Sequence, residues 1–122
     1  FCKDNGVGIT PYLPFAAGRL TRDWDEQTYR SENDQVAKGL FTKTEEADRK
    51  VAKRVAEVAA NRGIPRAQVA LAWLLQKEEV TAPVIGATKI GHLEDAVSAL
   101  SVKLIIDEIN RLEELYIPHQ LV

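Results

Sequence analysis

Residues 80–96 read VTAPVIGATKIGHLEDA, and this stretch decides what kind of fold the chain can form. The run from Val80 to Ile85 is apolar almost without alternation, as in a strand that is covered on both faces. Gly86 permits a sharp turn and a close approach of the backbone to a ligand. Thr88 is suited to cap a helix that follows. The pattern therefore predicts a buried strand, a tight turn and a helix.

The start of that helix is a candidate anion site. Its first N–H groups have no partner within the helix, and Lys89 and His92 add side chains that donate hydrogen bonds at the same end. The alternative is an ordinary strand-to-helix turn with a solvated lysine and histidine. The stretch contains neither the GxxxxGK[ST] phosphate loop nor the GxGxxG dinucleotide pattern. From the residues alone, both alternatives remain open.

Composition narrows the class of protein. The 122 residues are enough for about one domain, and 45% apolar with 28% charged residues is typical of a globular chain. A net charge of -2, evenly spread, argues against nucleic-acid or anionic-membrane partners. No apolar run approaches the roughly 18 residues of a membrane span. The one cysteine, Cys2, excludes an internal disulfide and favours a reducing, cytoplasmic location, and the spacing of Cys2 from the two histidines predicts no metal site.

Over the whole chain the predicted order is strand, long loop, helices, strand and helix, without an internal sequence repeat. Residues 1–6 resemble the last turn of a helix that ends at Gly6, residues 7–12 should form a strand, and the long polar stretch 21–39 is typical of a functional lid. A Thr-x-x-Glu capping box at residues 42–45 predicts a helix at about 43–61. Further helices are expected at about 65–76, 90–99 and 107–115, followed by an irregular tail.

This order of elements predicts consecutive parallel βα units. Two strands alone would leave backbone groups unpaired along their edges. We therefore expect the missing strands to come from the rest of a larger fold, or from other copies of the chain through self-association at the strand edges.

Three segments resemble a known family. They are ITPYLPFAAGRL at Ile9–Leu20, QVALAWLL at Gln68–Leu75 and IGATK at Ile85–Lys89. In this order they resemble the C-terminal part of an aldo-keto reductase, closest to the bacterial branch that is also related to potassium-channel β-subunits. The resemblance implies an α/β fold in which all of residues 1–122 form the C-terminal fragment, about strands seven and eight with their helices, of one TIM (β/α)8 barrel. Such barrels of about 250 residues place ligands on the loops that follow the strands.

The resemblance also implies a cofactor, NADP(H), and a small-molecule carbonyl substrate. The nicotinamide would stack on the aromatic ring at the end of strand seven, the pyrophosphate would lie in the loop after it, and the 2′-phosphate and adenine ribose would lie on the turn after strand eight. An aspartate further along the helix expected at about 90–99 would face the adenine. The implied cofactor-binding residues are, in that order, Tyr12; Leu13, Pro14, Phe15, Gly18, Leu20 and Arg30; Gly86, Thr88, Lys89 and His92; and Asp95.

Two positions depart from the family pattern. Leu13 stands where the family usually has a serine, so a hydroxyl contact to phosphate would be lost, and Asp95-Ala96 stands where Glu-Asn is common. The family's catalytic Asp, Tyr, Lys and His lie on early strands, and no residue of this sequence matches them. In that chemistry the tyrosine donates a proton to the carbonyl oxygen while the cofactor supplies hydride.

Two functions follow from this resemblance. In the first, the chain is part of an NADP(H)-dependent oxidoreductase that reduces aldehydes and ketones to alcohols, and the 122-residue chain alone is inactive. In the second, it is a regulatory or interaction subunit that binds pyridine nucleotide without turnover.

Overall fold

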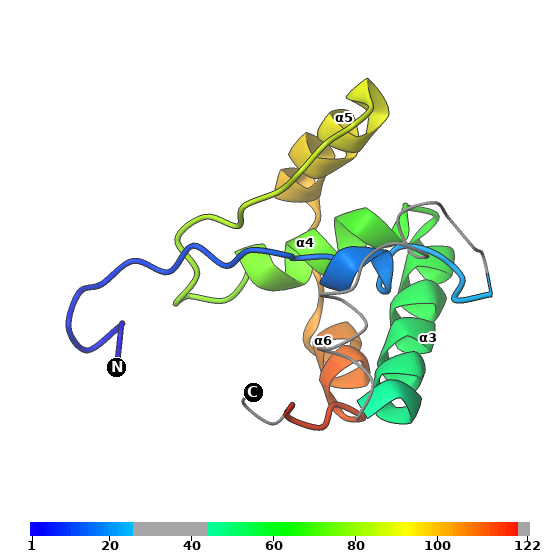
Figure 1. Ribbon diagram of the computed structural model, residues 1–122, viewed down its shortest axis with the longest axis horizontal. Helices are drawn as coiled ribbons and strands as arrows, with labels where there is room; N and C mark the ends of the chain where they lie inside the picture. The colour runs from blue at the N-terminus through cyan, green and yellow to red at the C-terminus, as the bar shows by residue number, and fades with distance from the viewer. Residues whose placement is uncertain (26–43, 120–122) are drawn as a thin grey trace.

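The computed structural model describes residues 1–25 and 44–119 (Figure 1). Four α-helices and two short 3-10 helices make up the regular structure of these residues, joined by extended segments. In chain order they are η1 (Ala16–Gly18), α3 (Glu45–Arg62), α4 (Arg66–Leu75), α5 (Ile90–Ser98), η3 (Ala99–Ser101) and α6 (Ile106–Glu113). The four helices expected from the sequence are confirmed, with bounds that differ by only a few residues.

Helix α3 begins two residues later than the start expected from the sequence. Its N-cap residue is Thr44 and Glu45 is the first helical residue, while Thr42, the capping residue expected from the sequence, lies outside the described residues. The Thr44 hydroxyl donates to Asp48 at 2.7 Å instead of capping a backbone group. The helix ends at Gly63, which adopts a left-handed φ of 65° that favours glycine.

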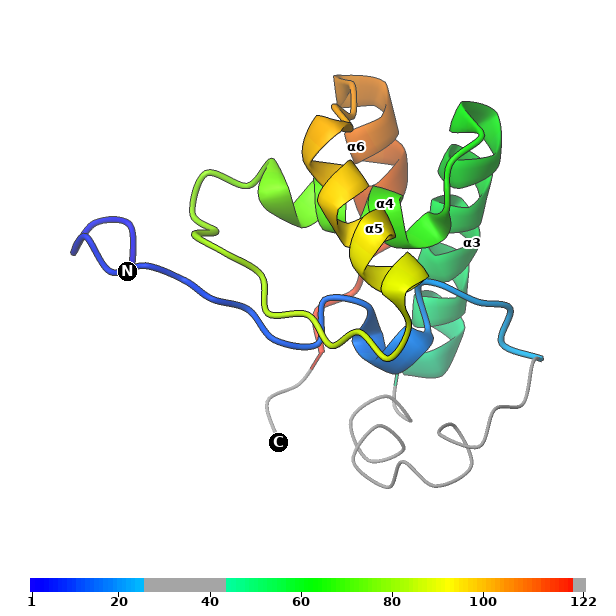
Figure 2. The same ribbon diagram turned by 90° about the horizontal axis from the view of Figure 1, so that it is seen from above.

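Helix α4 lies at the centre of the packing. It contacts α3, α5 and η3, and α3 in turn contacts α6 (Figures 1 and 2). Its side chains from Gln68 to Ala72 are buried, as the nearly continuous apolar sequence predicts. The core cluster is contributed by α3, α4, α6 and the segment before α6. It consists of Val55, Val58, Ala59, Val69, Ala72, Leu104 and Leu112.

The two expected strands, 7–12 and 80–85, lie side by side in parallel but pair through only one bridge, Ile9 with Val80. Thr81 N donates to Ile9 O and Val84 N donates to Pro11 O, each at 2.8 Å. The Ile9 N–H donates to the Thr81 hydroxyl at 3.0 Å, and Pro11 has no N–H to donate. The described residues therefore hold the parallel arrangement without a regular strand, and the predicted strands remain unconfirmed as elements of a barrel.

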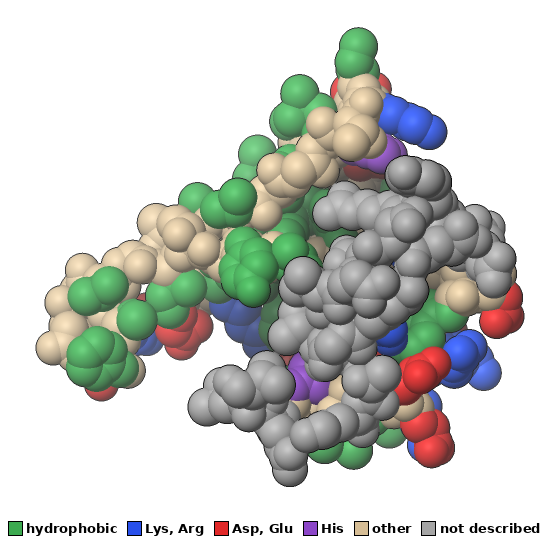
Figure 3. Space-filling view, in the orientation of Figure 1, with side chains coloured by type: hydrophobic (Ala, Val, Ile, Leu, Met, Phe, Trp, Pro, Cys, Tyr) green, Lys and Arg blue, Asp and Glu red, His purple; other side chains and the backbone are tan. Residues whose placement is uncertain are grey.

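Helix α5 has an apolar face that the described residues leave uncovered. Figure 2 shows α5 lying across α4, and no residue of α5 is buried. The exposed apolar residues recur at spacings of three and four, which places them on one side of the helix. They are Ile90, Leu93, Val97 and, in η3, Leu100, with exposed fractions of 77%, 53%, 59% and 70%. Hydrophobic side chains are visible along α5 in Figure 3.

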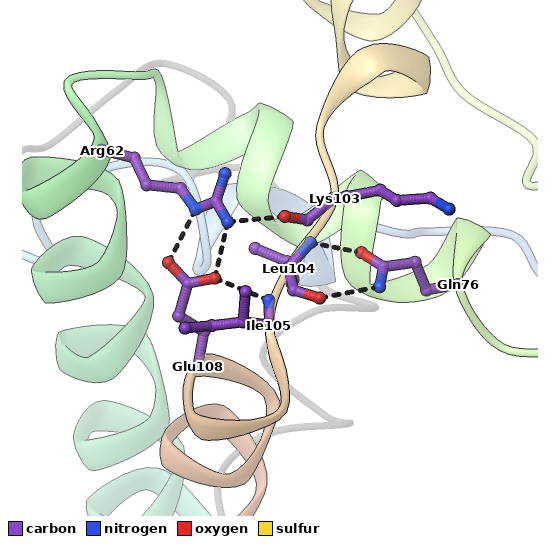
Figure 4. Close-up of polar contacts among 6 residues, drawn as sticks. All are labelled: Arg62, Gln76, Lys103, Leu104, Ile105 and Glu108. Carbon is purple, nitrogen blue, oxygen red and sulfur yellow. Dashed lines mark hydrogen bonds and ion pairs between the residues drawn. The ribbon is translucent and has the colours of Figure 1, made fainter.

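The segment between η3 and α6 is held from both sides (Figure 4). Arg62, at the end of α3, binds Glu108 through two contacts of 2.6 and 2.7 Å and donates to the Lys103 carbonyl at 2.5 Å. Gln76, directly after α4, accepts from Leu104 N at 2.7 Å and donates to Leu104 O at 3.0 Å. The ends of α3 and α4 therefore fix where α6 begins.

The expected turn at residues 1–6 is confirmed. Gly6 has a φ of 65°, Gly6 N donates to Lys3 O at 3.2 Å and Val7 N donates to Cys2 O at 2.8 Å. These two bonds form the pattern that ends a helix at a left-handed glycine. Within residues 1–25 and 44–119, no helix combines the length and the apolar character needed to cross a membrane.

Candidate functional site

The loop from Leu13 to Arg22 has an unusual backbone. Leu13, Ala16 and Ala17 have φ values of 54°, 49° and 57°, and Gly18 has a φ of 89°. For residues with a Cβ, this left-handed conformation costs about 1 kcal/mol or more each. Such strain persists only where the surroundings fix the backbone, and it is concentrated at functional sites. The loop is therefore a candidate ligand-binding segment on its geometry alone.

Local hydrogen bonds give the loop its shape. Gly18 N donates to Phe15 O at 2.9 Å, Leu20 N donates to the same carbonyl at 3.3 Å, and Thr21 N donates to Gly18 O at 3.2 Å. The Thr21 hydroxyl also donates to Gly18 O at 3.2 Å. Each bond joins residues close in sequence, so these bonds determine the local turn but not its position on the helices.

Side chains at the end of the loop attach it to α3 and α4. The Trp24 indole N–H donates to Arg19 O at 2.9 Å. The Arg19 and Arg49 guanidinium carbons lie 4.5 and 4.9 Å from the centre of the Trp24 ring, which is cation–π distance. Asp23 accepts from Arg66 at 2.8 Å. The loop is thus tied to one arginine on each of the two helices.

A cavity of about 700 Å³ lies between this loop and the helices. Its described walls are mostly apolar and include Tyr12, Leu13, Pro14 and Leu20 of the predicted cofactor-binding residues. None of the predicted residues in 86–95 lines it. The walls from the helices and the tail are Asp48, Val51, Val55, Val69, Ala70, Trp73, Leu74, Lys77, Leu112, Glu113, Tyr116 and His119.

Two polar groups in this cavity were not singled out by the sequence. Glu113 accepts hydrogen bonds from Lys77 and from the Trp73 indole, the latter at 2.8 Å. The hydrogen bond from Lys77 lowers the pKa of Glu113, burial opposes that shift, and the Trp73 indole supports it. The Asp48 carboxylate and the His119 Nε2 atom lie 2.9 Å apart, within hydrogen-bond distance. These residues are up to 71 positions apart in the chain, so no local motif could have indicated them.

The turn at residues 86–89 leads into the exposed start of α5. Gly86, Thr88, Lys89 and His92 are all exposed. The N-cap residue of α5 is Lys89, and no side chain caps the helix, so the prediction that Thr88 is the cap is wrong. Nothing lies within 4 Å of a Cβ built at Gly86, which leaves open space above the turn.

At the start of α5, His92 N donates to Lys89 O at 3.1 Å, and the N–H groups of Ile90 and Gly91 lack partners within the helix. Within the described residues, the Lys89 ammonium and the His92 imidazole make no side-chain hydrogen bond or ion pair. The start of α5 therefore combines a helix N-terminus, a cation and an imidazole in one exposed place. This set of groups is suited to an anion.

Asp95 lies one turn further along α5 and is half-buried. Its carboxylate accepts from the Gln68 side-chain amide of α4 at 3.1 Å. Asp95 therefore helps attach α5 to α4, and one of its oxygens is already engaged. Arg30, the remaining predicted residue, lies outside the described residues.

The predicted residues thus fall into two groups that the structure does not bring into one cavity. Figure 1 shows the N-terminal end of α5 at the top of the view, at the far end of that helix from the linker that leads to α6, and η1 lies well below it. In the first group, Tyr12, Leu13, Pro14 and Leu20 line the cavity, whereas Phe15 and Gly18 belong to the same loop but not to its lining. The second group, at 86–92, surrounds the start of α5.

The comparison with protein families identifies the chain. The model of the aldo/keto reductase family matches residues 1–117. The chain belongs to the aldo/keto reductase family. Membership implies a TIM barrel for the whole fold, and the narrower resemblance to the branch related to potassium-channel β-subunits stays a prediction.

Curated relatives agree with this family. An aldo-keto reductase of Fusarium vanettenii is 38% identical over 119 residues, which cover 97% of this chain and 32% of that protein. An aldo-keto reductase of Metarhizium robertsii is 39% identical over 123 residues, covering 99% of this chain and 32% of that protein. Versiconal hemiacetal acetate reductase of Aspergillus parasiticus is 35% identical over 120 residues, which cover 97% of this chain and 35% of that protein. The chain spans about a third of the length of these aldo/keto reductases.

Proposed function

We propose that this chain is the dinucleotide-binding part of an NADP(H)-dependent aldo-keto reductase that reduces aldehydes or ketones to alcohols. The observation that carries the proposal is the exposed start of α5, where the Lys89 and His92 side chains accompany the N–H groups of Ile90 and Gly91, which have no partner within the helix. The names of the relatives, which are reductases, support the direction of the reaction.

The groups at α5 fit the 2′-phosphate of NADP(H). A phosphate monoester carries close to two negative charges near neutral pH, and a lysine ammonium with helix N–H groups satisfies both its charge and its acceptor oxygens. Thr88 offers a hydroxyl beside them, and Gly86 leaves space for close approach. An NAD(H)-specific site would instead need an acceptor for the ribose 2′-hydroxyl.

The loop after residue 12 fits the remainder of the dinucleotide. The Tyr12 ring is 72% exposed at the end of the parallel segment, so it offers an open face on which a nicotinamide ring could stack. The strained turn from Leu13 to Gly18 follows Tyr12 directly. The Arg19 and Arg22 side chains bring positive charge to the same loop, where a pyrophosphate would lie.

Within this proposal, the bound cofactor supplies the hydride, and the chain's own residues bind and orient it. No residue of the chain matches the family's catalytic tyrosine, lysine, histidine and aspartate, so proton donation to the carbonyl oxygen falls to residues outside this sequence. We expect the 122-residue chain alone to show no turnover.

Two structural features support a barrel as the setting of this site. The segments at Ile9 and Val80 run parallel, as neighbouring barrel strands do, and α5 presents an uncovered apolar face. Further βα units would pair the free edges of these segments and cover the face of α5. A cytoplasmic location and self-association at the strand edges both remain predictions.

The proposal is tested by titrating the intact protein with NADPH and with NADH. We expect tighter binding of NADPH, because only this cofactor carries the 2′-phosphate. Equal affinities for the two cofactors would contradict the assignment of the α5 start. NADPH oxidation by the purified 122-residue chain in the presence of an aldehyde would contradict the expectation that it is inactive.

A further inference from the structure

The loop from Leu13 to Arg22 needs an external constraint. Three of its residues with side chains hold left-handed φ values, and its internal hydrogen bonds join residues no more than five positions apart. Such bonds do not decide where the loop lies on the helices. A strained conformation persists only when contacts from the surrounding structure determine it.

Trp24 supplies a contact of that kind. Two guanidinium groups lie within cation–π distance of its ring, that of Arg19 within the loop at 4.5 Å and that of Arg49 on α3 at 4.9 Å. Its indole N–H donates to the Arg19 carbonyl at 2.9 Å, which fixes the backbone directly after η1. One side chain therefore joins the strained part of the loop to α3.

Asp23, the residue before it, extends the connection to the other helix. Its carboxylate accepts from Arg66 at the start of α4 at 2.8 Å. The Arg49 guanidinium also lies 3.9 Å from the Asp25 carboxylate. The three consecutive residues Asp23, Trp24 and Asp25 therefore contact both helices. The end of the loop is attached to α3 through Arg49 and to α4 through Arg66.

We propose that Trp24 is a positioning residue that holds the loop from Leu13 to Arg22 in the shape required to retain the dinucleotide. It acts through the loop backbone rather than by taking part in hydride or proton transfer. The inference rests on the proposed function for its ligand, but the attachment of the loop to α3 can be measured without any ligand.

The test compares Trp24→Leu with Trp24→Phe in the intact protein. Leucine removes both the ring and the N–H donor, whereas phenylalanine removes the donor and keeps an aromatic ring for the two guanidinium groups. We expect amide hydrogen exchange at Gly18, Leu20 and Thr21 to become at least about tenfold faster in Trp24→Leu, and less so in Trp24→Phe. Exchange in α6 should stay unchanged.

The second measurement is the NADPH dissociation rate. We expect it to rise about tenfold in Trp24→Leu, with a smaller change in the association rate, because a loosened loop retains the ligand for less time. Tyr116→Leu is the matched control, since it removes another aromatic wall of the cavity without touching Trp24 and should leave loop exchange unchanged.

Loop exchange at the wild-type rate in Trp24→Leu would overturn the inference, as would faster exchange with an unchanged NADPH dissociation rate. If Trp24→Leu also accelerates exchange in α6, the loop exchange rates of Trp24→Phe and the wild type are compared instead, and equal rates would overturn the inference. A wild-type protein that does not bind NADPH would overturn the proposed function, and the exchange rates would still decide whether Trp24 fixes the loop.

Discussion

Gln76 and Leu104 pair through two hydrogen bonds of opposite direction. The side-chain oxygen of Gln76 accepts from Leu104 N at 2.7 Å, and its side-chain nitrogen donates to Leu104 O at 3.0 Å (Figure 4). The amide thus takes the place of a neighbouring strand for one residue of the linker. Leu104 itself is only 5% exposed and belongs to the core cluster, so its backbone groups have little access to water.

Gln76→Ala should therefore lower the free energy of unfolding by about 2 kcal/mol, because it leaves two poorly hydrated backbone groups without partners. Urea unfolding of the intact protein measures this loss. Asn110→Ala, at an exposed position of α6, is the matched control and should change stability by less than about 0.5 kcal/mol. Equal effects of the two substitutions would contradict the importance of the Gln76 contacts.

The ion pair between Arg62 and Glu108 predicts a pH dependence of stability. The hydrogen bond from Arg62 holds the pKa of Glu108 below its ordinary value of 4.5, with burial opposing the shift. A pKa that is lower in the folded state gives stability that is fully present above the unfolded pKa and is lost as the pH falls through the folded pKa. Glu113 contributes with the same sign through its hydrogen bond from Lys77.

We expect the free energy of unfolding to fall as the pH drops below 4.5, and Glu108→Gln to make that fall shallower. Glutamine keeps an oxygen that can accept from Ile105 N, a bond of 2.9 Å in the wild type, but it no longer titrates. Urea unfolding at a series of pH values measures the slope. A slope identical to that of the wild type would show that Glu108 titrates normally in the folded state.

Gly8 and Thr81 should be energetically coupled. A Cβ built at Gly8 would lie 2.9 Å from the Thr81 hydroxyl, which accepts from Ile9 N at 3.0 Å. Gly8→Ala must therefore displace that hydroxyl and should cost about 1 kcal/mol, the net contribution of one hydrogen bond. In the Thr81→Ala background the same substitution meets no hydroxyl and should cost less.

A double-mutant cycle on urea unfolding measures this coupling. Gly91→Ala is the control, because nothing lies within 4 Å of a Cβ at that position and a helical alanine is favoured over glycine. If Gly8→Ala costs the same in both backgrounds, the Thr81 hydroxyl is not the group that requires glycine at position 8.

Lys89→Ala should weaken NADPH binding by about 1.5–3 kcal/mol, the contribution of a charge-assisted hydrogen bond, and leave NADH binding nearly unchanged. Calorimetric titration of the intact protein measures both affinities. Lys53→Ala removes an exposed lysine from α3 and should affect neither cofactor. Equal losses for NADPH and NADH in Lys89→Ala would place Lys89 away from the 2′-phosphate.

The sequence predicted the helices because helical periodicity is a local property. The apolar spacing in α3 coincides with its buried residues, and the first residues of the nearly continuous apolar run of α4, Val69 to Ala72, are buried. The helix starts were less predictable: Thr88 suits a cap by type, but the structure places Lys89 there. Capping depends on backbone geometry, which a residue type favours but does not determine.

The tertiary contacts were beyond prediction from residue patterns. Arg62 and Glu108 are 46 positions apart and Gln76 and Leu104 are 28 apart, so no local spacing connects them. The left-handed backbone at Leu13, Ala16 and Ala17 was equally hidden, since such residues are rarely found in that conformation. Of the candidate site, the sequence identified the two segments, and the resemblance to the family gave each residue its role.

The uncovered apolar face of α5 has a practical consequence for anyone handling the 122-residue chain by itself. An exposed apolar patch of this kind promotes aggregation between molecules. It is formed by Ile90, Leu93, Val97 and Leu100. When such a preparation is heated, loss of the folded-state signal would then reflect aggregation between molecules as well as unfolding of each molecule. Replacing Leu93 and Val97 with glutamate would separate the two effects. The added negative charges make the molecules repel one another, and neither residue belongs to the core cluster.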